Sequence, residues 1–292
     1  FLIPVAAALG VHTTFFGQGR LPHRPITAYL RELTKKGIAF EYHNTMPFSI
    51  DGALQSGVYE LEGDVSSQYV TGLLFALPLL EGDSEIRMLS RLESKPYVDL
   101  TIACLRHFGV TVHETEQGYT VPGGQQYHAC DMEVEGDYSQ AAFFYVANAL
   151  GSDITLTNLN PESVQGDKKI VEITQQMCYN REKGLPACFD VDAADIPDLV
   201  PILAVLATFG TAPSRITGAH RLAIKESDRL ASTADLLNRL GGRIAMCAAV
   251  AATRCTGEVT ILHGECVEKS YPRFYEDYRQ LGGIANVIVL ES

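Results

Sequence analysis

The hydrophobic pattern of the chain predicts two kinds of helix that alternate along it. Three stretches are apolar nearly all round, which is typical of helices buried on every side. Each follows a polar turn, and they begin near Ser66, Ser139 and Ile196. Residues 243–250 look like a fourth copy without its leading turn. A β-like run follows each of the four: Ser84–Met88, Asp153–Leu159, Ser214–Gly218 and Glu258–His263.

Amphipathic helices are predicted between these buried ones, because their apolar positions recur with the helical period on one face only. They cover Pro25–Lys36, Tyr97–Phe108, Lys168–Met177 and Leu230–Leu240. The order helix, strands, buried helix, strand recurs along the chain. It predicts an α/β fold built from repeated β-α-β units.

The spacing of the copies predicts interruptions. A strand-rich segment separates the outer helix from the buried helix at 38–62 and 110–134, but it shrinks to about 178–189 in the third copy and is missing at 242–243. We favour omission of two hairpins over their deletion, because a repeat protein rarely loses the same piece twice and stays packed. The chain also opens on Phe1 inside an apolar run, as a fragment would. We expect two domains, residues 1–134 (a partial one) and 135–292.

Composition narrows the class of protein. With 292 residues, 46% of them hydrophobic and 20% charged, the chain is globular and long enough for two domains. No run of about 18 apolar residues is present, so we expect no membrane span. A net charge of −12 argues against a nonspecific nucleic-acid binder. Seven cysteines without a CxxC pair favour reduced thiols in a cytoplasmic protein.

Several chemical motifs are missing from the sequence. It has no GxxxxGK[ST], GxSxG, HExxH or dinucleotide fingerprint, and its eight histidines are scattered. We therefore expect neither a metal nor an organic cofactor.

Two serine motifs are candidates for binding an anion. Ser66-Ser67-Gln68 lies at the expected start of a buried helix, where free N–H groups and two hydroxyls would suit a phosphate ester. The alternative, an ordinary serine cap, is favoured on spacing alone. Ser94, in Ser94-Lys-Pro-Tyr97, could cap the next helix or hold a phosphate.

Basic residues form a second set of candidates. Lys225 and Arg229 lie at i and i+4 on one helical face, which makes most sense opposite a multiply charged anion. A solvated helix start, neutralised by Glu226, is an equal alternative. Arg20 belongs to a basic turn that would otherwise be a charged surface loop. Two further candidates, Arg243 and Lys269, are each more typical of surface residues when taken singly.

Asp198 follows Pro197 at an expected helix start. A carboxylate there complements the helix dipole. The functional alternative is a general base.

Taken together and in order, the motifs resemble those of the EPSP synthase family over nearly the whole chain. The residues that carry the resemblance are Gly-Asp-Val-Ser-Ser-Gln, Ser-Lys-Pro-Tyr, Glu-Gly-Asp-Tyr-Ser-Gln-Ala-Ala, Asp-Ala-Ala-Asp-Ile-Pro-Asp, Lys-Glu-Ser-Asp-Arg-Leu and Lys-Ser-Tyr-Pro. The resemblance implies two inside-out α/β barrels. It also implies transfer of the enolpyruvyl group of phosphoenolpyruvate to the 5-hydroxyl of shikimate 3-phosphate, with release of phosphate. We expect these small molecules to be the only partners of a monomeric enzyme.

The resemblance also assigns roles to the candidate residues. The positions matched to shikimate 3-phosphate binding are Ser66, Ser67, Gln68, Ser94 and Lys225. Those matched to phosphoenolpyruvate binding are Arg20, Arg229, Arg243 and Lys269. Asp198 matches the proton acceptor for the 5-hydroxyl, and Glu226 matches a carboxylate that moves protons to and from the methylene carbon.

Two alternatives remain at this point. One is the related enolpyruvyl transferase that acts on UDP-N-acetylglucosamine, against which Ser66–Gln68 and the motif at 225–229 argue. The other is an inactive fragment that only binds substrate. The family's amino-terminal section, with a Lys-Ser pair and an Asn-Ala/Ser-Gly-Thr turn, is not found ahead of Phe1. A chain of only these residues is therefore expected to be nearly inactive.

Overall fold

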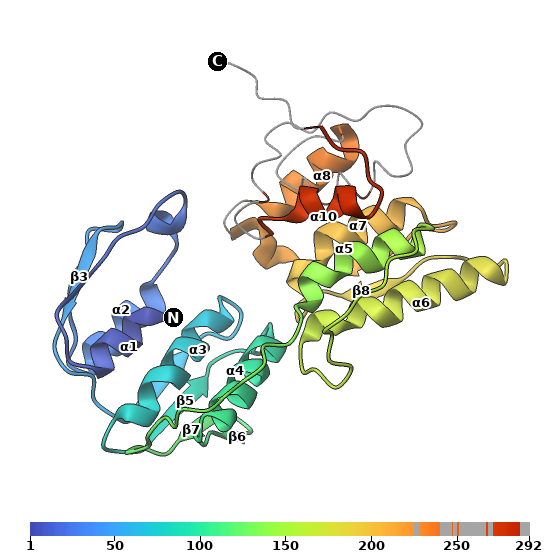
Figure 1. Ribbon diagram of the computed structural model, residues 1–292. Helices are drawn as coiled ribbons and strands as arrows, with labels where there is room; N and C mark the ends of the chain where they lie inside the picture. The colour runs from blue at the N-terminus through green and yellow to red at the C-terminus, as the bar shows by residue number, and fades with distance from the viewer. Residues whose placement is uncertain (225–227, 240–246, 248–249, 251–266, 268–270, 287–292) are drawn as a thin grey trace. The chain divides into compact units, whose positions relative to one another are not determined.

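The computed structural model describes residues 1–224, 228–239, 247, 250, 267 and 271–286 (Figure 1). Contacts divide the chain into two compact units. The first unit is Phe1–Val134 with Val164–Gly166, and the second is Glu135–Ser163 with Asp167–Ser292. Each unit is described separately below.

From α2 onward, the first unit contains helices and strands in the order that the sequence pattern predicts, whereas α1 and β1 ahead of it were not predicted. Its helices are α1 (Leu2–Ala8), α2 (Thr27–Lys35), α3 (Ser67–Ala76) and α4 (Lys95–His107), with short 3-10 helices η1 (Leu21–His23) and η2 (Leu77–Leu79). Its strands are β1 (Thr13–Phe15), β2 (Ala39–Glu41), β3 (Phe48–Asp51), β4 (Val58–Leu61), β5 (Ser84–Met88), β6 (His113–Thr115) and β7 (Gly118–Val121).

Two sheets form in this unit. An antiparallel sheet has the order β1-β3-β2, and a mixed sheet has the order β4-β5-β7-β6. Strands β4 and β5 are parallel, with Val58 opposite Glu85 and Leu61 opposite Met88. Helix α3 connects them, so β4-α3-β5 is a β-α-β unit.

Helix α3 is buried as its pattern predicts. Seven of its ten residues are buried, including Leu73 and Leu74 with no exposed surface. The amphipathic α4 buries only three of its thirteen residues. An all-apolar helix must be covered on every side, whereas an amphipathic helix needs only one covered face. Helix α3 is therefore an inner helix of the unit and α4 an outer one.

The described part of the second unit contains one further β-α-β arrangement. Its helices are α5 (Tyr138–Ala149), α6 (Lys169–Glu182), α7 (Val200–Thr208), α8 (Arg229–Arg239) and α10 (Phe274–Gln280), with 3-10 helices η3 (Gly166–Lys168), η4 (Pro197–Leu199) and η5 (His220–Ile224). Strands β8 (Asp190–Asp192) and β9 (Arg215–Thr217) are parallel and α7 connects them. The sequence pattern does not predict α10, whose Phe274 packs with Phe144 in a small separate core.

The β-like run Asp153–Leu159 is not a strand, and that prediction is wrong. The side-chain amide of Asn148 explains why: its Nδ2 donates to the carbonyl of Ile154 at 2.8 Å, and its Oδ1 accepts the N–H of Ile154 at 2.8 Å. Those are the two backbone groups that a strand would use in a ladder.

Two strand-rich segments also differ from expectation. Helix α6 extends through Glu182, so the segment 178–189 begins as helix. The segment 110–134 has no strand beyond Val121; there the Gln125 side chain binds the carbonyls of Pro122 and Thr111. The predicted strand Glu258–His263 and most of the helix expected at 243–250 lie outside the described residues. Within the described part of the chain, no helix is long and apolar enough to cross a membrane.

Candidate active site

Ser66 caps helix α3 at the turn that follows β4. Its backbone is extended, with φ of −163°, and its Oγ accepts the N–H of Gln68 at 3.3 Å. Ser67 is the first residue of the helix. The motif is therefore a serine cap, as the simpler interpretation predicts. The same geometry places a helix start beside two hydroxyls, which is an arrangement that binds anions.

Ser94 lies in the corresponding turn after β5, directly before α4. Its backbone is left-handed, with φ of +57°, and only 2% of its surface is exposed. A left-handed serine costs about 1–2 kcal/mol, and such residues cluster at functional sites. Because β4 and β5 are parallel, their carboxyl ends share one edge of the sheet. The structure thus brings Ser94 to the same edge as the turn that carries Ser66.

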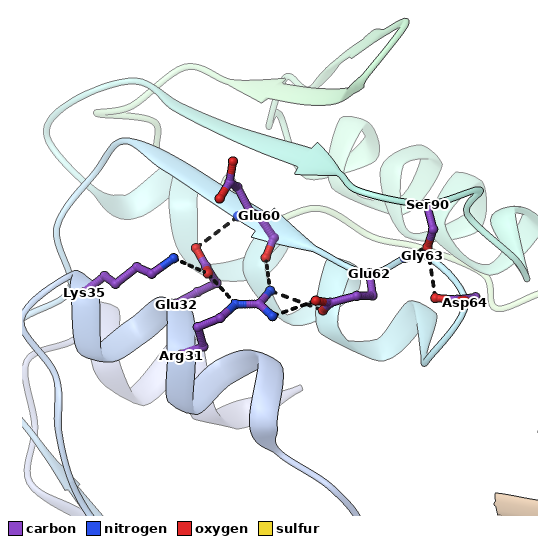
Figure 2. A network of polar contacts seen from close by, with 8 residues as sticks. All are labelled: Arg31, Glu32, Lys35, Glu60, Glu62, Gly63, Asp64 and Ser90. Carbon is purple, nitrogen blue, oxygen red and sulfur yellow. Dashed lines mark hydrogen bonds and ion pairs between the residues drawn. The ribbon is translucent and has the colours of Figure 1, made fainter.

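Helix α2 supports the first of these turns through polar contacts. The buried hydroxyl of Tyr29 donates to the carbonyl of Tyr69, in the first turn of α3, at 2.9 Å, and burial raises the pKa of Tyr29. Arg31 binds both carboxylate oxygens of Glu62 at 2.6 and 3.2 Å and the carbonyl of Glu60 at 2.6 Å (Figure 2). The end of β4 is therefore held from the α2 side.

Glu32 lies at the centre of this network (Figure 2) and only 1% of its side chain is exposed. It accepts bonds from Arg31 Nε at 2.8 Å, Lys35 Nζ at 2.9 Å and the N–H of Glu60 at 3.0 Å. Burial alone would raise the pKa of the carboxyl group. The bonds from Arg31, Lys35 and Glu60 outweigh burial and hold the pKa of Glu32 below its ordinary value.

We expect Glu32→Gln to lower the free energy of unfolding at pH 7 by about 1–3 kcal/mol, because charge-assisted bonds become neutral ones. The folded-state pKa of Glu32 is lowered, so its stabilisation is present above the unfolded pKa of about 4.3. It is lost as the pH falls through the folded pKa. Urea denaturation of Glu32→Gln and of the unsubstituted protein, at pH 7 and at about pH 3, measures the difference in the free energy of unfolding at each pH.

Glu116→Gln is the control for this measurement, since Glu116 is exposed in the turn between β6 and β7. It should change stability by less than about 0.5 kcal/mol. A difference between Glu32→Gln and the unsubstituted protein that stays the same at both pH values would show that the charge of Glu32 contributes nothing.

Arg20 belongs to the first unit but is not joined to this edge by any described contact. It is exposed at the start of η1. The same loop reaches the start of α3 a few residues later, because the Tyr69 hydroxyl donates to the carbonyl of Pro25.

Asp198 lies in the second unit, at the start of η4, which leads directly into α7. The neighbouring Pro197 and Leu199 are buried, whereas 32% of the Asp198 side chain is exposed. Burial of these two apolar neighbours holds the turn that carries the half-buried carboxylate.

Asp198 pairs with Arg229, the first residue of α8. Arg229 Nη1 donates to Asp198 Oδ1 at 2.5 Å, and 28% of the arginine side chain is exposed. The structure thus joins two of the predicted site residues across 31 positions of sequence. A guanidinium carries five N–H donors, enough to serve an aspartate and an anionic ligand together.

Arg221 is a residue of this region that the sequence pattern does not single out. It is 4% exposed, and its Nη2 donates to the carbonyl of Ala194 at 2.8 Å in the loop that leads to Asp198. The backbone N–H of Ala193 binds the carbonyl of Thr217 at 2.8 Å. The signal in the sequence that could have identified Arg221 is its position four residues before the motif at 225–229.

The remaining predicted site residues, Lys225, Glu226, Arg243 and Lys269, lie outside the described residues. Among the described residues, no group of three or more His, Cys, Asp or Glu side chains is placed to hold a metal ion.

The structure is similar to solved enolpyruvyl transferases. An EPSP synthase from Acinetobacter baumannii superposes with a TM-score of 0.77 over 98% of this chain and 78% of that one, at 21% identity. The enolpyruvyl transferase NikO from Streptomyces tendae gives a TM-score of 0.66 over 97% of this chain and 76% of that one, at 14% identity. The chain therefore has the α/β fold of enolpyruvyl transferases, as the resemblance implied.

Sequence comparison identifies the family. The model of the family described as EPSP synthase (3-phosphoshikimate 1-carboxyvinyltransferase) matches residues 1–244 and 242–278. A 3-phosphoshikimate 1-carboxyvinyltransferase of Clostridium kluyveri is 41% identical over 322 residues, covering 97% of this chain and 76% of the relative. One of Clostridium beijerinckii is 37% identical over 325 residues, covering 97% of this chain and 75% of the relative. The chain belongs to the EPSP synthase family.

The alignments bear on the interruptions that the repeat spacing predicts. The alignment with the C. kluyveri relative runs over 322 positions, more than the 292 residues of this chain, so the relative has residues that this chain lacks. The two segments matched by the family model meet at residues 242–244. The location of the missing residues stays a prediction.

Proposed function

We propose that this chain carries out the reaction named for its family. The enolpyruvyl group of phosphoenolpyruvate is transferred to the 5-hydroxyl of shikimate 3-phosphate, and inorganic phosphate is released. The observation that carries the proposal is the match to named 3-phosphoshikimate 1-carboxyvinyltransferases over 97% of the chain.

In this proposal the edge formed by the turns after β4 and β5 binds shikimate 3-phosphate. The start of α3 supplies N–H groups and the hydroxyls of Ser66 and Ser67, which suit the 3-phosphate. Gln68 and Ser94 lie at the same edge. Lys225 is assigned to this substrate by its motif alone.

Arg229 is proposed to bind phosphoenolpyruvate, together with Arg20, Arg243 and Lys269. Negative charge shifts within phosphoenolpyruvate as the hydroxyl adds to its C2, and fixed cations stabilise that state. The guanidinium of Arg229 is held by Asp198, so little reorganisation is needed when the anion binds.

Asp198 is proposed to accept the proton of the 5-hydroxyl as the new O–C2 bond forms. Glu226, by its motif, delivers a proton to the methylene carbon and removes one when phosphate leaves, which restores the C=C bond. A carboxylate is the form that accepts a proton, and the pairing with Arg229 neutralises its charge and directs one oxygen. No cofactor takes part in this scheme.

The test is release of inorganic phosphate by the purified protein with shikimate 3-phosphate and phosphoenolpyruvate, added singly and together. We expect release only when both are present. Replacing shikimate 3-phosphate by UDP-N-acetylglucosamine is the control for the related transferase. Calorimetry with shikimate 3-phosphate alone measures binding without turnover.

Each other result contradicts the proposal in a different way. Release with UDP-N-acetylglucosamine would assign the chain to the other substrate. Binding of shikimate 3-phosphate without phosphate release would mean a chain that binds substrate but is inactive.

A further inference from the structure

The turns after β4 and β5 touch each other through their backbones. A Cβ at Gly63 would lie 2.6 Å from the carbonyl oxygen of Arg91 and 2.7 Å from the Cα of Leu92, so no larger residue fits there. The N–H of Glu93 donates to the carbonyl of Gly63 at 3.0 Å. Any shift of one turn is therefore passed directly to the other.

The Ser90 side chain also joins the two turns, just beyond the paired residues of β4 and β5. The last ladder-like bond between the strands runs from the N–H of Leu89 to the carbonyl of Leu61 at 2.8 Å. One residue on, Ser90 Oγ accepts the N–H of the buried Gly63 at 2.9 Å and donates to Asp64 Oδ1 at 2.9 Å. Figure 2 shows Ser90 directly beside Gly63 and Asp64.

These two bonds use the Ser90 hydroxyl both as an acceptor and as a donor. Without the Ser90 hydroxyl, the N–H of Gly63, which is itself a buried residue, loses its acceptor, and a buried donor without an acceptor lowers stability. The exposed Asp64 carboxylate also loses the bond that holds it to Ser90. It could then turn toward Ser66, two residues further on, where it would repel an anion.

We propose that Ser90 is a positioning residue for the phosphate of the substrate bound at this edge. Ser90 sets the spacing and direction of the two turns that carry Ser66 with Ser67 on one side and Ser94 on the other. It touches no substrate itself. The inference rests on the proposed function, because it assumes that shikimate 3-phosphate binds between these turns.

The test is steady-state kinetics of Ser90→Ala with both substrates varied. We expect the KM for shikimate 3-phosphate to rise about tenfold, the loss expected for a misplaced anion-binding turn. The KM for phosphoenolpyruvate and kcat should stay within about twofold. Ser90→Thr keeps the hydroxyl and should restore the KM for shikimate 3-phosphate to within about threefold.

Gln125→Ala is the matched control in the same unit. The Gln125 side chain also joins two segments: it accepts the N–H of Thr111 at 2.7 Å and donates to the carbonyl of Pro122 at 2.7 Å. Its backbone N–H donates to the carbonyl of Pro78. Pro78 follows the C-terminal end of α3, whereas Ser67 is at the N-terminal end. Gln125→Ala should lower stability, measured by urea denaturation, without changing either KM.

Ser67→Ala separates failure of this inference from failure of the proposed function. If Ser67→Ala raises the KM for shikimate 3-phosphate and Ser90→Ala does not, Ser90 does not position the site. If neither variant changes that KM, the edge is not the substrate site at all. Equal effects of Ser90→Ala and Gln125→Ala on both substrates would show a general loss of structure instead.

Discussion

Asp198→Asn is expected to lower kcat by about 10²–10⁴-fold, the usual contribution of a general base. The amide cannot accept the proton of the 5-hydroxyl. Its oxygen can still accept the bond from Arg229 that the carboxylate accepts at 2.5 Å, so the local geometry should persist. Affinity for shikimate 3-phosphate, measured by calorimetry, should remain within about threefold.

Asp190→Asn is the control for this experiment. Asp190 is exposed at the start of β8, in the same unit, and the change removes the same charge. Its kcat should equal that of the unsubstituted protein. Full activity of Asp198→Asn would remove Asp198 from the mechanism and leave the helix dipole as the explanation for a carboxylate at this position.

Arg229→Gln is expected to raise the KM for phosphoenolpyruvate by about 10–100-fold, because a hydrogen-bonded charge contact with an anion is lost. The glutamine amide can still donate to Asp198, so the turn around η4 should keep its position. Affinity for shikimate 3-phosphate should change by less than about threefold. Initial-rate kinetics with each substrate varied in turn separate the two effects.

The control is Arg215→Gln, an exposed arginine at the start of β9 in the same unit, which should change neither KM. If Arg229→Gln lowers kcat and leaves the KM for phosphoenolpyruvate unchanged, Arg229 acts only by holding Asp198. A double-mutant cycle with Asp198→Asn then measures the coupling between the two side chains.

Much of the fold could be predicted from local patterns. Strand β5 has the bounds that its β-like run predicts, Ser84–Met88, and α2 lies within Pro25–Lys36. The period of the apolar positions indicates how many faces of an element are buried. This pattern can be read from residues that are close together in the sequence. The same pattern failed at Asp153–Leu159, because the side-chain amide of Asn148, six positions before Ile154, binds the backbone groups of Ile154.

Part of the candidate site could also be predicted locally. The cap at Ser66 follows from a serine placed before an apolar helix, and the position of Asp198 follows from a proline at a helix start. Neither motif shows which residues of other elements it contacts. Each therefore had a structural alternative, a serine cap or a helix-dipole carboxylate, until the motifs were taken together as those of one family.

The sequence by itself determined the alternation of buried and amphipathic helices, the helix starts and the family. Only the tertiary structure decided that Asp198 meets Arg229, that Ser90 joins the turn of Gly63, and that Ser94 shares an edge with Ser66. The physical reason is range. Caps and periodicity depend on residues within a few positions, whereas these contacts join residues 27 or more positions apart and depend on parallel strand pairing and on loop paths.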